Sequence, residues 1–220
     1  LYAVLAEMEI NGSVIDMDVN AHLDEIYTAK LHTLRAEITK HLGPINPNSP
    51  TQLAKALKEA VPNIKLTKRD WTRAVGDEED EEANTSRAVL EREKDKHPVI
   101  PHILEFRKYR TRHSTFIKGV REKYAVVHGG KSYVHPTYRP DVVETYRLSS
   151  QAPNDQNAPR KDNDDPELSI KKQVVSRFPG GKIIEADQSQ IEIRIAAWLS
   201  QDEKMLAAIA SGEDIHTSMA

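Results

Sequence analysis

Apolar residues recur at every third or fourth position through much of the first half of the chain, the spacing that places side chains on one face of an α-helix. The clearest run begins at Asn20 and ends at Gly43-Pro44, where glycine and proline stop a helix. Its apolar positions are Leu23, Ile26, Tyr27, Leu31, Leu34, Ile38 and Leu42. Residues 1–20 fit a helix or a strand equally well and end in a turn at Asn11-Gly12.

A second helix is predicted from its start signal. Ser49 is placed to cap it, Pro50 occupies the first helical position, and Gln52 is spaced to reach back to the cap. Pro62 marks its end. The apolar face consists of Leu53, Ala56 and Leu57. Another helix is predicted from about Ser86 to Lys96, and a long one follows His97-Pro98 to about Tyr124.

The second half of the chain predicts short strands as well as helices. Residues 126–134 around Gly129-Gly130 are typical of a β-hairpin. Residues 178–181 predict a turn, and residues 182–187 a short strand. A capping box from Ser189 to Glu192 predicts the next helix, and a second box from Ser200 to Glu203 predicts a helix that ends at Gly212. We expect the first of these helices to bury Ile191, Ile195, Trp198 and Leu199.

Composition narrows the class of protein. The chain has 220 residues, 38% of them hydrophobic, and no cysteine, which excludes a disulfide scaffold and any metal site built on thiolates. No run approaches the ~18 consecutive apolar residues of a membrane span, so we expect a soluble protein without a membrane partner. A cytoplasmic location fits this composition.

The net charge of −3 conceals two oppositely charged segments. Residues 77–82 are six consecutive acids, which we interpret as a solvated loop. Residues 101–150 hold ten Lys and Arg against four acids. Five positions of the long helix share one face at helical spacing: Arg107, Arg110, Ser114, Lys118 and Arg121. This face is either an ordinary solvated surface or a surface for the phosphate backbone of nucleic acid.

Two other segments are candidates for chemistry. Asp187 ends the predicted strand directly before a helix. A carboxylate in this place can bind a divalent cation, cap the helix or form a salt bridge. Residues 145–166 are polar, irregular and rich in amide side chains, so they form either plain surface or a binding loop.

Three motifs together resemble DNA polymerase family A, the bacterial DNA polymerase I family. Residues 187–194, Asp-Gln-Ser-Gln-Ile-Glu-Ile-Arg, are similar to its first catalytic motif, Asp-Tyr-Ser-Gln-Ile-Glu-Leu-Arg. Residues 147–159 resemble its Arg-Leu-Ser-Ser…Pro-Asn-Leu-Gln-Asn-Ile-Pro loop, and residues 212–217 its Gly-Lys-Asp-Ile-His-Thr. Weaker likeness covers residues 9–12, 48–53 and 114–116, so the motifs span nearly the whole chain in the family's order.

The resemblance implies an α+β fold in which a mostly helical thumb joins a partial antiparallel palm sheet. Residues 1–19 would be a palm-associated segment, residues 20–124 the thumb, and residues 125–220 a partial palm with the start of the fingers. The implied partners are primer–template DNA and deoxynucleoside triphosphates. The implied DNA-binding residues are Arg107, Arg110, Arg112, His113, Ser114, Thr115, Lys118, Arg121, Arg147, Asn154, Gln156 and Asn157.

The implied reaction is template-directed nucleotidyl transfer with two magnesium ions. Asp187 would be one of two catalytic aspartates and a metal ligand, and Gln188 would add its backbone carbonyl. The implied nucleotide-binding residues are Gln190, Ile191, Glu192, Lys161 and His216. Glu192 also has a purely local explanation, because the capping box accounts for it; the two roles are compatible.

The departures from the family pattern are as informative as the matches. Gln188 replaces a tyrosine, Tyr146 a glycine, and Asp155 and Ala158 apolar residues. The fingers helix and the second catalytic carboxylate are not found among these residues, nor is a proofreading domain. We therefore expect a polymerase fragment that does not extend primers alone, and that a complementary chain completes, in a bacterial cytoplasm or a phage-infected host.

Two alternatives remain open. The first is a non-catalytic DNA-binding module derived from the polymerase fold. The second is a small metal-dependent nuclease that uses Asp187 with Glu185 or Glu192, although this reading leaves the loop at 147–159 unexplained.

Overall fold

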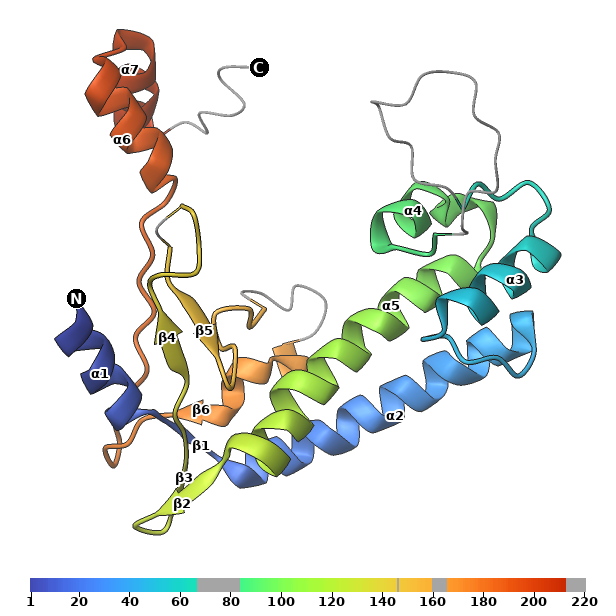
Figure 1. The fold of residues 1–220 in the computed structure, drawn as a ribbon, viewed down its shortest axis with the longest axis horizontal. Helices are drawn as coiled ribbons and strands as arrows, with labels where there is room; N and C mark the ends of the chain where they lie inside the picture. Colours follow the sequence, from blue (N-terminus) through green and yellow to red (C-terminus); the bar gives the residue numbers. More distant parts are fainter. Residues whose placement is uncertain (67–83, 146, 160–165, 213–220) are drawn as a thin grey trace. The chain divides into compact units, whose positions relative to one another are not determined.

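The computed structural model describes residues 1–66, 84–145, 147–159 and 166–212 (Figure 1). It divides into two units, residues 1–181 and residues 182–220. The acidic run at 77–82 lies outside the described residues, as do Tyr146, Lys161 and His216. Within the described part of the chain, no helix is both long enough and apolar enough to cross a membrane.

Two long helices, α2 (Met17–Leu42) and α5 (Val99–Arg112), run side by side in opposite directions and form the axis of the first unit (Figure 1). The predicted helix after Asn20 is confirmed, but it begins three residues earlier because the Asp16 carboxylate accepts hydrogen bonds from the backbone N–H groups of Asp18 and Val19, both at 3.0 Å. Gly43, with φ 73°, ends it. Its buried apolar residues are Leu23, Tyr27, Leu34 and Ile38.

Three shorter helical segments pack at the end of this pair where α2 finishes and α5 begins. They are α3 (Pro50–Ala60), α4 (Arg87–Arg92) and the 3₁₀ turn η1 (Lys94–Lys96). The predicted apolar face of α3 is confirmed, because Leu53, Ala56 and Leu57 are buried. One hydrophobic core joins α3 and α4 to α2 and α5. The backbone N–H of Asn84 donates to the carbonyl of Leu66 at 2.7 Å, so these two residues lie next to each other.

The predicted long helix extends to Tyr124, but its second half is π-helical and not α-helical. α5 ends at Arg112 and continues as π-helical turns, η2 (His113–Lys118) and η3 (Val120–Tyr124). Gly119 permits the wider turn, since a Cβ atom there would lie 2.9 Å from the Ser114 carbonyl oxygen. Buried amides pair with the backbone of these turns: Gln173 donates to the Phe116 carbonyl at 2.9 Å, and Asn20 to the Ile117 carbonyl at 3.2 Å.

An antiparallel sheet closes the other end of the first unit, with strand order β2-β3-β1-β6. Its strands are β1 (Ser13–Ile15), β2 (Val126–His128), β3 (Lys131–Val134) and β6 (Val174–Val175). The predicted hairpin is confirmed, and the positive φ of Gly129 (55°) and Gly130 (75°) suits a tight turn whose twist matches the strands.

A second, two-stranded sheet pairs β4 (Thr137–Arg139) with β5 (Ser149–Gln151). The first residues of the chain form helix α1 (Tyr2–Asn11), which packs near β4. Two 3₁₀ turns, η4 (Pro166–Leu168) and η5 (Ile170–Gln173), lead into β6. Helices α2 to α5 thus form one part of the unit, and the antiparallel strands form another with α1 beside them, which confirms the α+β prediction (Figure 1).

The second unit contains two helices, α6 (Ile191–Ser200) and α7 (Glu203–Ser211). The predicted strand at 182–187 is wrong: this segment has no regular structure and pairs with no described strand. An extended segment becomes a strand only when a neighbouring strand forms hydrogen bonds with its backbone N–H and C=O groups. The sequence pattern of the segment does not reveal whether such a neighbour exists.

The predicted helix starts also need correction. Gln190, with φ 54°, precedes α6, and no side chain caps that helix, so the Ser189–Glu192 capping box does not form. The cap of α7 is Asp202, whose carboxylate accepts from the N–H of Met205 at 2.9 Å, in place of the predicted Ser200. Gly212 ends α7 as predicted, with φ 75°.

The expected burial of the apolar face of α6 is wrong within the described residues. Ile191, Ile195, Trp198 and Leu199 are all exposed, Trp198 at 67% and Leu199 at 69%. Two helices alone can cover only one side of each other, so the second unit by itself leaves most of this face uncovered.

Candidate nucleic-acid interface

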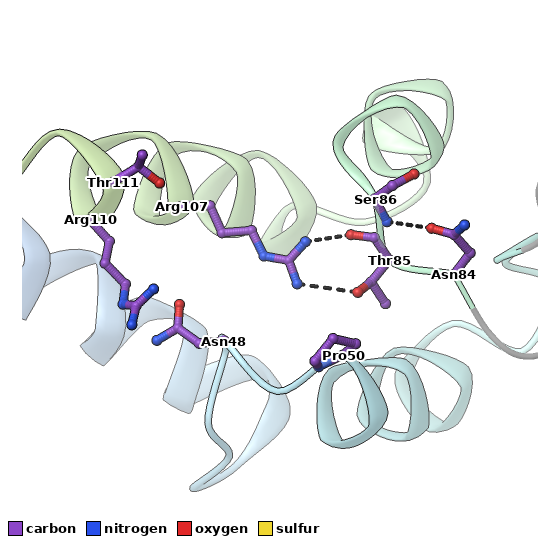
Figure 2. A pocket seen from close by; sticks show the side chains of 8 residues that line it. All are labelled: Asn48, Pro50, Asn84, Thr85, Ser86, Arg107, Arg110 and Thr111. Atoms are coloured by element: carbon purple, nitrogen blue, oxygen red, sulfur yellow. Dashed lines mark hydrogen bonds between the residues drawn. The ribbon is translucent and has the colours of Figure 1, made fainter. Parts of the chain in front are cut away.

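An open hollow of about 610 Å³ lies where the starts of α3 and α4 meet the C-terminal half of α5 (Figure 2). Asn48 and Pro50 come from the start of α3, and residues 84–86 from the segment that leads into α4. α5 contributes two cations and a hydroxyl. The full lining is Asn48, Pro50, Asn84, Thr85, Ser86, Arg107, Arg110 and Thr111.

Arg107 braces one wall of this hollow. Its guanidinium donates to the carbonyl of Thr85, and to the Thr85 hydroxyl at 3.2 Å (Figure 2). It also reaches the carbonyl of Pro47 at 3.4 Å. Burial lowers the pKa of this guanidinium, but an arginine stays charged at neutral pH. Arg107 therefore joins α5 to the segments before α3 and α4 while keeping a positive charge at the hollow.

Arg110 and the start of α3 add further positive charge to the hollow. Arg110 is exposed and forms no ion pair with any described residue. The Ser49 hydroxyl accepts from the N–H of Gln52 at 3.4 Å, which confirms the predicted cap. Gln52 does not reach back to Ser49; its side chain accepts from the N–H of Asn46 at 3.0 Å. The positive end of α3, two guanidinium groups and several hydroxyl and amide groups together suit a phosphate oxygen.

The predicted basic face is divided by the π-helical turns, which add residues per turn and change where later side chains point. Ser114 and Lys118 are exposed, and Thr115 is half-buried. Arg121 is turned towards α2, where its Nη2 donates to Asp24 at 2.6 Å. His113 is buried, with its Nε2 hydrogen-bonded to the other oxygen of Asp24.

Asp24 is thus hydrogen-bonded to two of the predicted DNA-binding side chains, those of Arg121 and His113. Burial alone would raise the pKa of this carboxyl group, but the hydrogen bonds from Arg121 and His113 outweigh burial and hold the pKa below its usual value. Arg112, a further predicted contact, is half-buried and has interactions of its own within the chain. Among the predicted stripe, Arg110, Ser114 and Lys118 present the most surface to a ligand.

The amide-rich loop after β5 folds around one hydroxyl. Ser150 donates to the Asn154 side-chain oxygen at 3.1 Å and accepts from the N–H of Gln156 at 3.2 Å. The same Asn154 oxygen accepts from the N–H of Asn157 at 3.2 Å. Asn154 therefore shapes the loop, while the side chains of Gln156 and Asn157 are exposed. Arg147, just before β5, is exposed and has intramolecular contacts.

The predicted catalytic segment lies in the second unit. Asp187 and Gln188 are exposed in the irregular segment before α6, and Glu192 is exposed in the first turn of that helix. Gln190 is half-buried, and Ile191 is exposed. Among the described residues, no three His, Asp or Glu side chains come together to hold a metal ion. A magnesium site needs several oxygen ligands, so the described residues do not by themselves fit one.

Sequence reasoning missed part of the hollow. Asn84, Thr85, Ser86 and Thr111 line it beside the predicted Arg107 and Arg110. A signal did exist, because residues 84–86 have the Asn-Thr-Ser composition of a helix start. What the sequence did not reveal is that this start lies across from α5.

Comparison with known proteins decides the family. The sequence model described as DNA polymerase family A matches residues 17–220. The chain belongs to DNA polymerase family A. It is 34% identical over 223 residues to DNA polymerase I of Bacillus subtilis, covering 100% of this chain and 23% of that protein. It is 31% identical over 226 residues to the thermostable DNA polymerase I of Thermus aquaticus, covering 100% of this chain and 25% of that protein.

The fold comparison agrees with the family. A solved structure of the POL domain of Pol1 from M. smegmatis, in complex with DNA primer-template and dNTP, matches with a TM-score of 0.74 and 29% identity. The match covers 96% of this chain and 35% of that one. The family A chain described here thus spans about a quarter of the length of the curated relatives it matches.

Proposed function

We propose that this chain binds primer–template DNA as part of a DNA-directed DNA polymerase, the helical part (residues 20–124) serving as the thumb that grips the duplex backbone. The observation that carries the proposal is the hollow with Arg107 and Arg110 beside the start of α3. Such a set of groups binds phosphate without reading bases, which a polymerase needs because it must accept every sequence.

The proposal assigns the second contact to the palm part, residues 125–220. Gln156 and Asn157 offer exposed amide groups, and Arg147 a guanidinium, to the backbone and minor groove near the primer end. The minor-groove acceptors are similar in all correct base pairs, so such contacts test pairing without choosing sequence. In support, the solved relative is a complex with DNA primer-template and dNTP.

The catalytic part of the proposal rests on the motif at 187–194. Asp187 would supply one carboxylate, and Gln188 a backbone carbonyl, to a magnesium-dependent nucleotidyl-transfer centre. The described residues include no cluster that would complete the ligand set. Gln190, Ile191, Glu192, Lys161 and His216 would surround the incoming nucleotide. Substitution of Asp187 by Asn should abolish primer extension measured after adding a polypeptide with the remaining family A regions.

The binding proposal is tested by charge reversal in the hollow. Arg110→Glu should weaken the affinity of the chain for a fluorescently labelled primed duplex by about tenfold at low salt, and should reduce the slope of log affinity against log salt by about 1. The matched control is Arg35→Glu on α2, another exposed arginine outside the hollow, which should change affinity much less.

Equal losses in both variants would mean that only net charge matters and would reject the hollow as the phosphate site. Loss of primer extension in Asp187→Asn with unchanged DNA affinity would support the catalytic assignment. Unchanged primer extension in that variant would leave a DNA-binding module without a catalytic role.

A further inference from the structure

Tyr138 on β4 and Asp155 in the loop after β5 form a hydrogen bond that the sequence did not predict. The Tyr138 hydroxyl donates to Asp155 Oδ2 at 2.9 Å. The backbone N–H of Tyr138 donates to Glu9 Oε1 of α1 at 2.6 Å, which fixes the tyrosine from its other side. Glu9 thus fixes the backbone of Tyr138, and the Tyr138 hydroxyl in turn fixes the Asp155 carboxylate.

The same loop is held from the neighbouring strand by the residue opposite Tyr138. Tyr138 and Ser150 are direct partners in the β4–β5 pairing. The Ser150 hydroxyl bonds to the Asn154 side chain and to the N–H of Gln156, as described above. The N–H of Ala158 donates to the Asp155 carbonyl at 3.0 Å. One cross-strand pair therefore holds the turn at residues 154–158 at two points.

A carboxylate in this loop is unexpected for a protein that binds DNA, because a free carboxylate repels phosphate. The family pattern has an apolar residue at position 155. Here Asp155 is half-buried, and its Oδ1 atom is buried without a partner among the described residues. Burial, and next the bond to Asp155, raise the pKa of the Tyr138 hydroxyl well above its usual value, so this hydroxyl remains a donor at neutral pH.

We propose that Tyr138 and Asp155 are positioning residues for DNA binding: their hydrogen bond holds the loop in the shape that presents Gln156 and Asn157 to the primer–template backbone. This inference rests on the proposed function and deepens it. Neither residue needs to contact DNA for this role. Both act by raising the fraction of molecules whose loop is ready to bind, and apparent affinity scales with that fraction.

The test measures affinity for a primed duplex in single variants of the full chain. Tyr138→Phe removes only the hydroxyl and should weaken binding by about threefold to tenfold. Asp155→Ala and Asp155→Asn both remove the negative charge, but only asparagine keeps an oxygen that can accept from Tyr138. Asp155→Ala should therefore weaken binding by a similar factor, while Asp155→Asn should stay within about twofold of the parent chain. Tyr133→Phe is the matched control, since the Tyr133 hydroxyl forms no hydrogen bond with a described residue.

A double variant, Tyr138→Phe with Asp155→Ala, completes the cycle. If the two residues act through one bond, the double variant should bind no worse than the weaker single variant. Tighter binding by Asp155→Ala and Asp155→Asn alike would mean that the carboxylate only repels DNA, which would overturn the proposal. Additive losses would also overturn it.

The inference and the proposed function fail in different ways. If the parent chain shows no salt-dependent binding to primed duplex, the proposed function fails. If the parent chain binds and Tyr138→Phe binds equally well, the positioning role fails while the proposed function stands. Thermal unfolding of each variant shows that the folded protein is compared throughout.

Discussion

Arg121 in the π-helical turns donates to Asp24 on α2 at 2.6 Å, across 97 positions of sequence. This contact takes an arginine from the predicted phosphate-binding face and uses it to join two helices of the first unit. The same carboxylate is hydrogen-bonded to His113. A cationic side chain at helical spacing is therefore not by itself a DNA contact, and the two arginines at positions 110 and 121 should behave differently when changed.

Replacement of Arg121 by Met should lower the free energy of unfolding by about 1–3 kcal/mol, because it leaves a partly buried carboxylate with one fewer partner. Replacement of Arg110 by Met should change unfolding by less than about 0.5 kcal/mol. Urea denaturation followed by circular dichroism measures both. Equal, small effects in the two variants would show that the Arg121–Asp24 contact contributes nothing to stability.

Glu93 predicts a pH dependence of folding. Its side chain is 4% exposed and accepts from the Lys65 N–H at 3.0 Å, with Lys96 and Arg92 at 2.7 and 3.1 Å. Burial would raise the pKa of Glu93, but these partners lower it from 4.5 to about 2. The stabilisation is thus complete above about pH 4.5 and is lost as the pH falls towards 2; about 2 kcal/mol should be gone at pH 3. The Glu93→Gln variant should lose less free energy of unfolding than the parent chain between pH 7 and pH 3.

Gly119 should resist a substitution that normally favours helices. Alanine usually stabilises a helix by about 1 kcal/mol relative to glycine. A Cβ atom at position 119 would lie 2.9 Å from the Ser114 carbonyl oxygen, which belongs to the backbone and cannot easily move. We therefore expect Gly119→Ala to lower the melting temperature. A higher melting temperature would indicate that the π-helical turns convert to an ordinary α-helix at no cost.

The buried amide pair predicts strong coupling between distant residues. Asn20 is fully buried and donates to the Gln173 side chain at 2.7 Å and to the Ile117 carbonyl. Asn20→Ala should cost about 2–4 kcal/mol, since it creates a cavity and leaves buried acceptors unpaired. The loss in an Asn20→Ala, Gln173→Ala double variant should be smaller than the sum of the single losses by at least ~1 kcal/mol. A purely additive result would argue that the two amides do not act as a unit.

Sequence predicted best where the cause is local. The α2 core positions Leu23 and Tyr27 and the Gly129-Gly130 turn follow from periodicity and glycine conformation within a few residues. The strand at 182–187 was predicted wrongly because its hydrogen-bond partner is a property of the fold, not of the segment. The exposed Trp198 shows the same limit, since an apolar pattern marks a face for burial without saying what covers it.

In the candidate site, too, the sequence predicted local features and missed contacts that depend on the fold. The motif at 187–194 and the cations Arg107 and Arg110 are visible in the sequence. The pairing of Arg121 with Asp24 and of Tyr138 with Asp155 is not, because each joins segments whose proximity depends on the whole first unit. The π-helical turns are also invisible to a helical-spacing argument, which assumes one number of residues per turn throughout.

The bond between Asn84 and Leu66 has a practical consequence. It fixes Leu66 and Asn84 next to each other at one point of the first unit. Asn84 also lines the hollow, so a fluorescent label attached at that position would sit close enough to register the arrival of a nucleic acid.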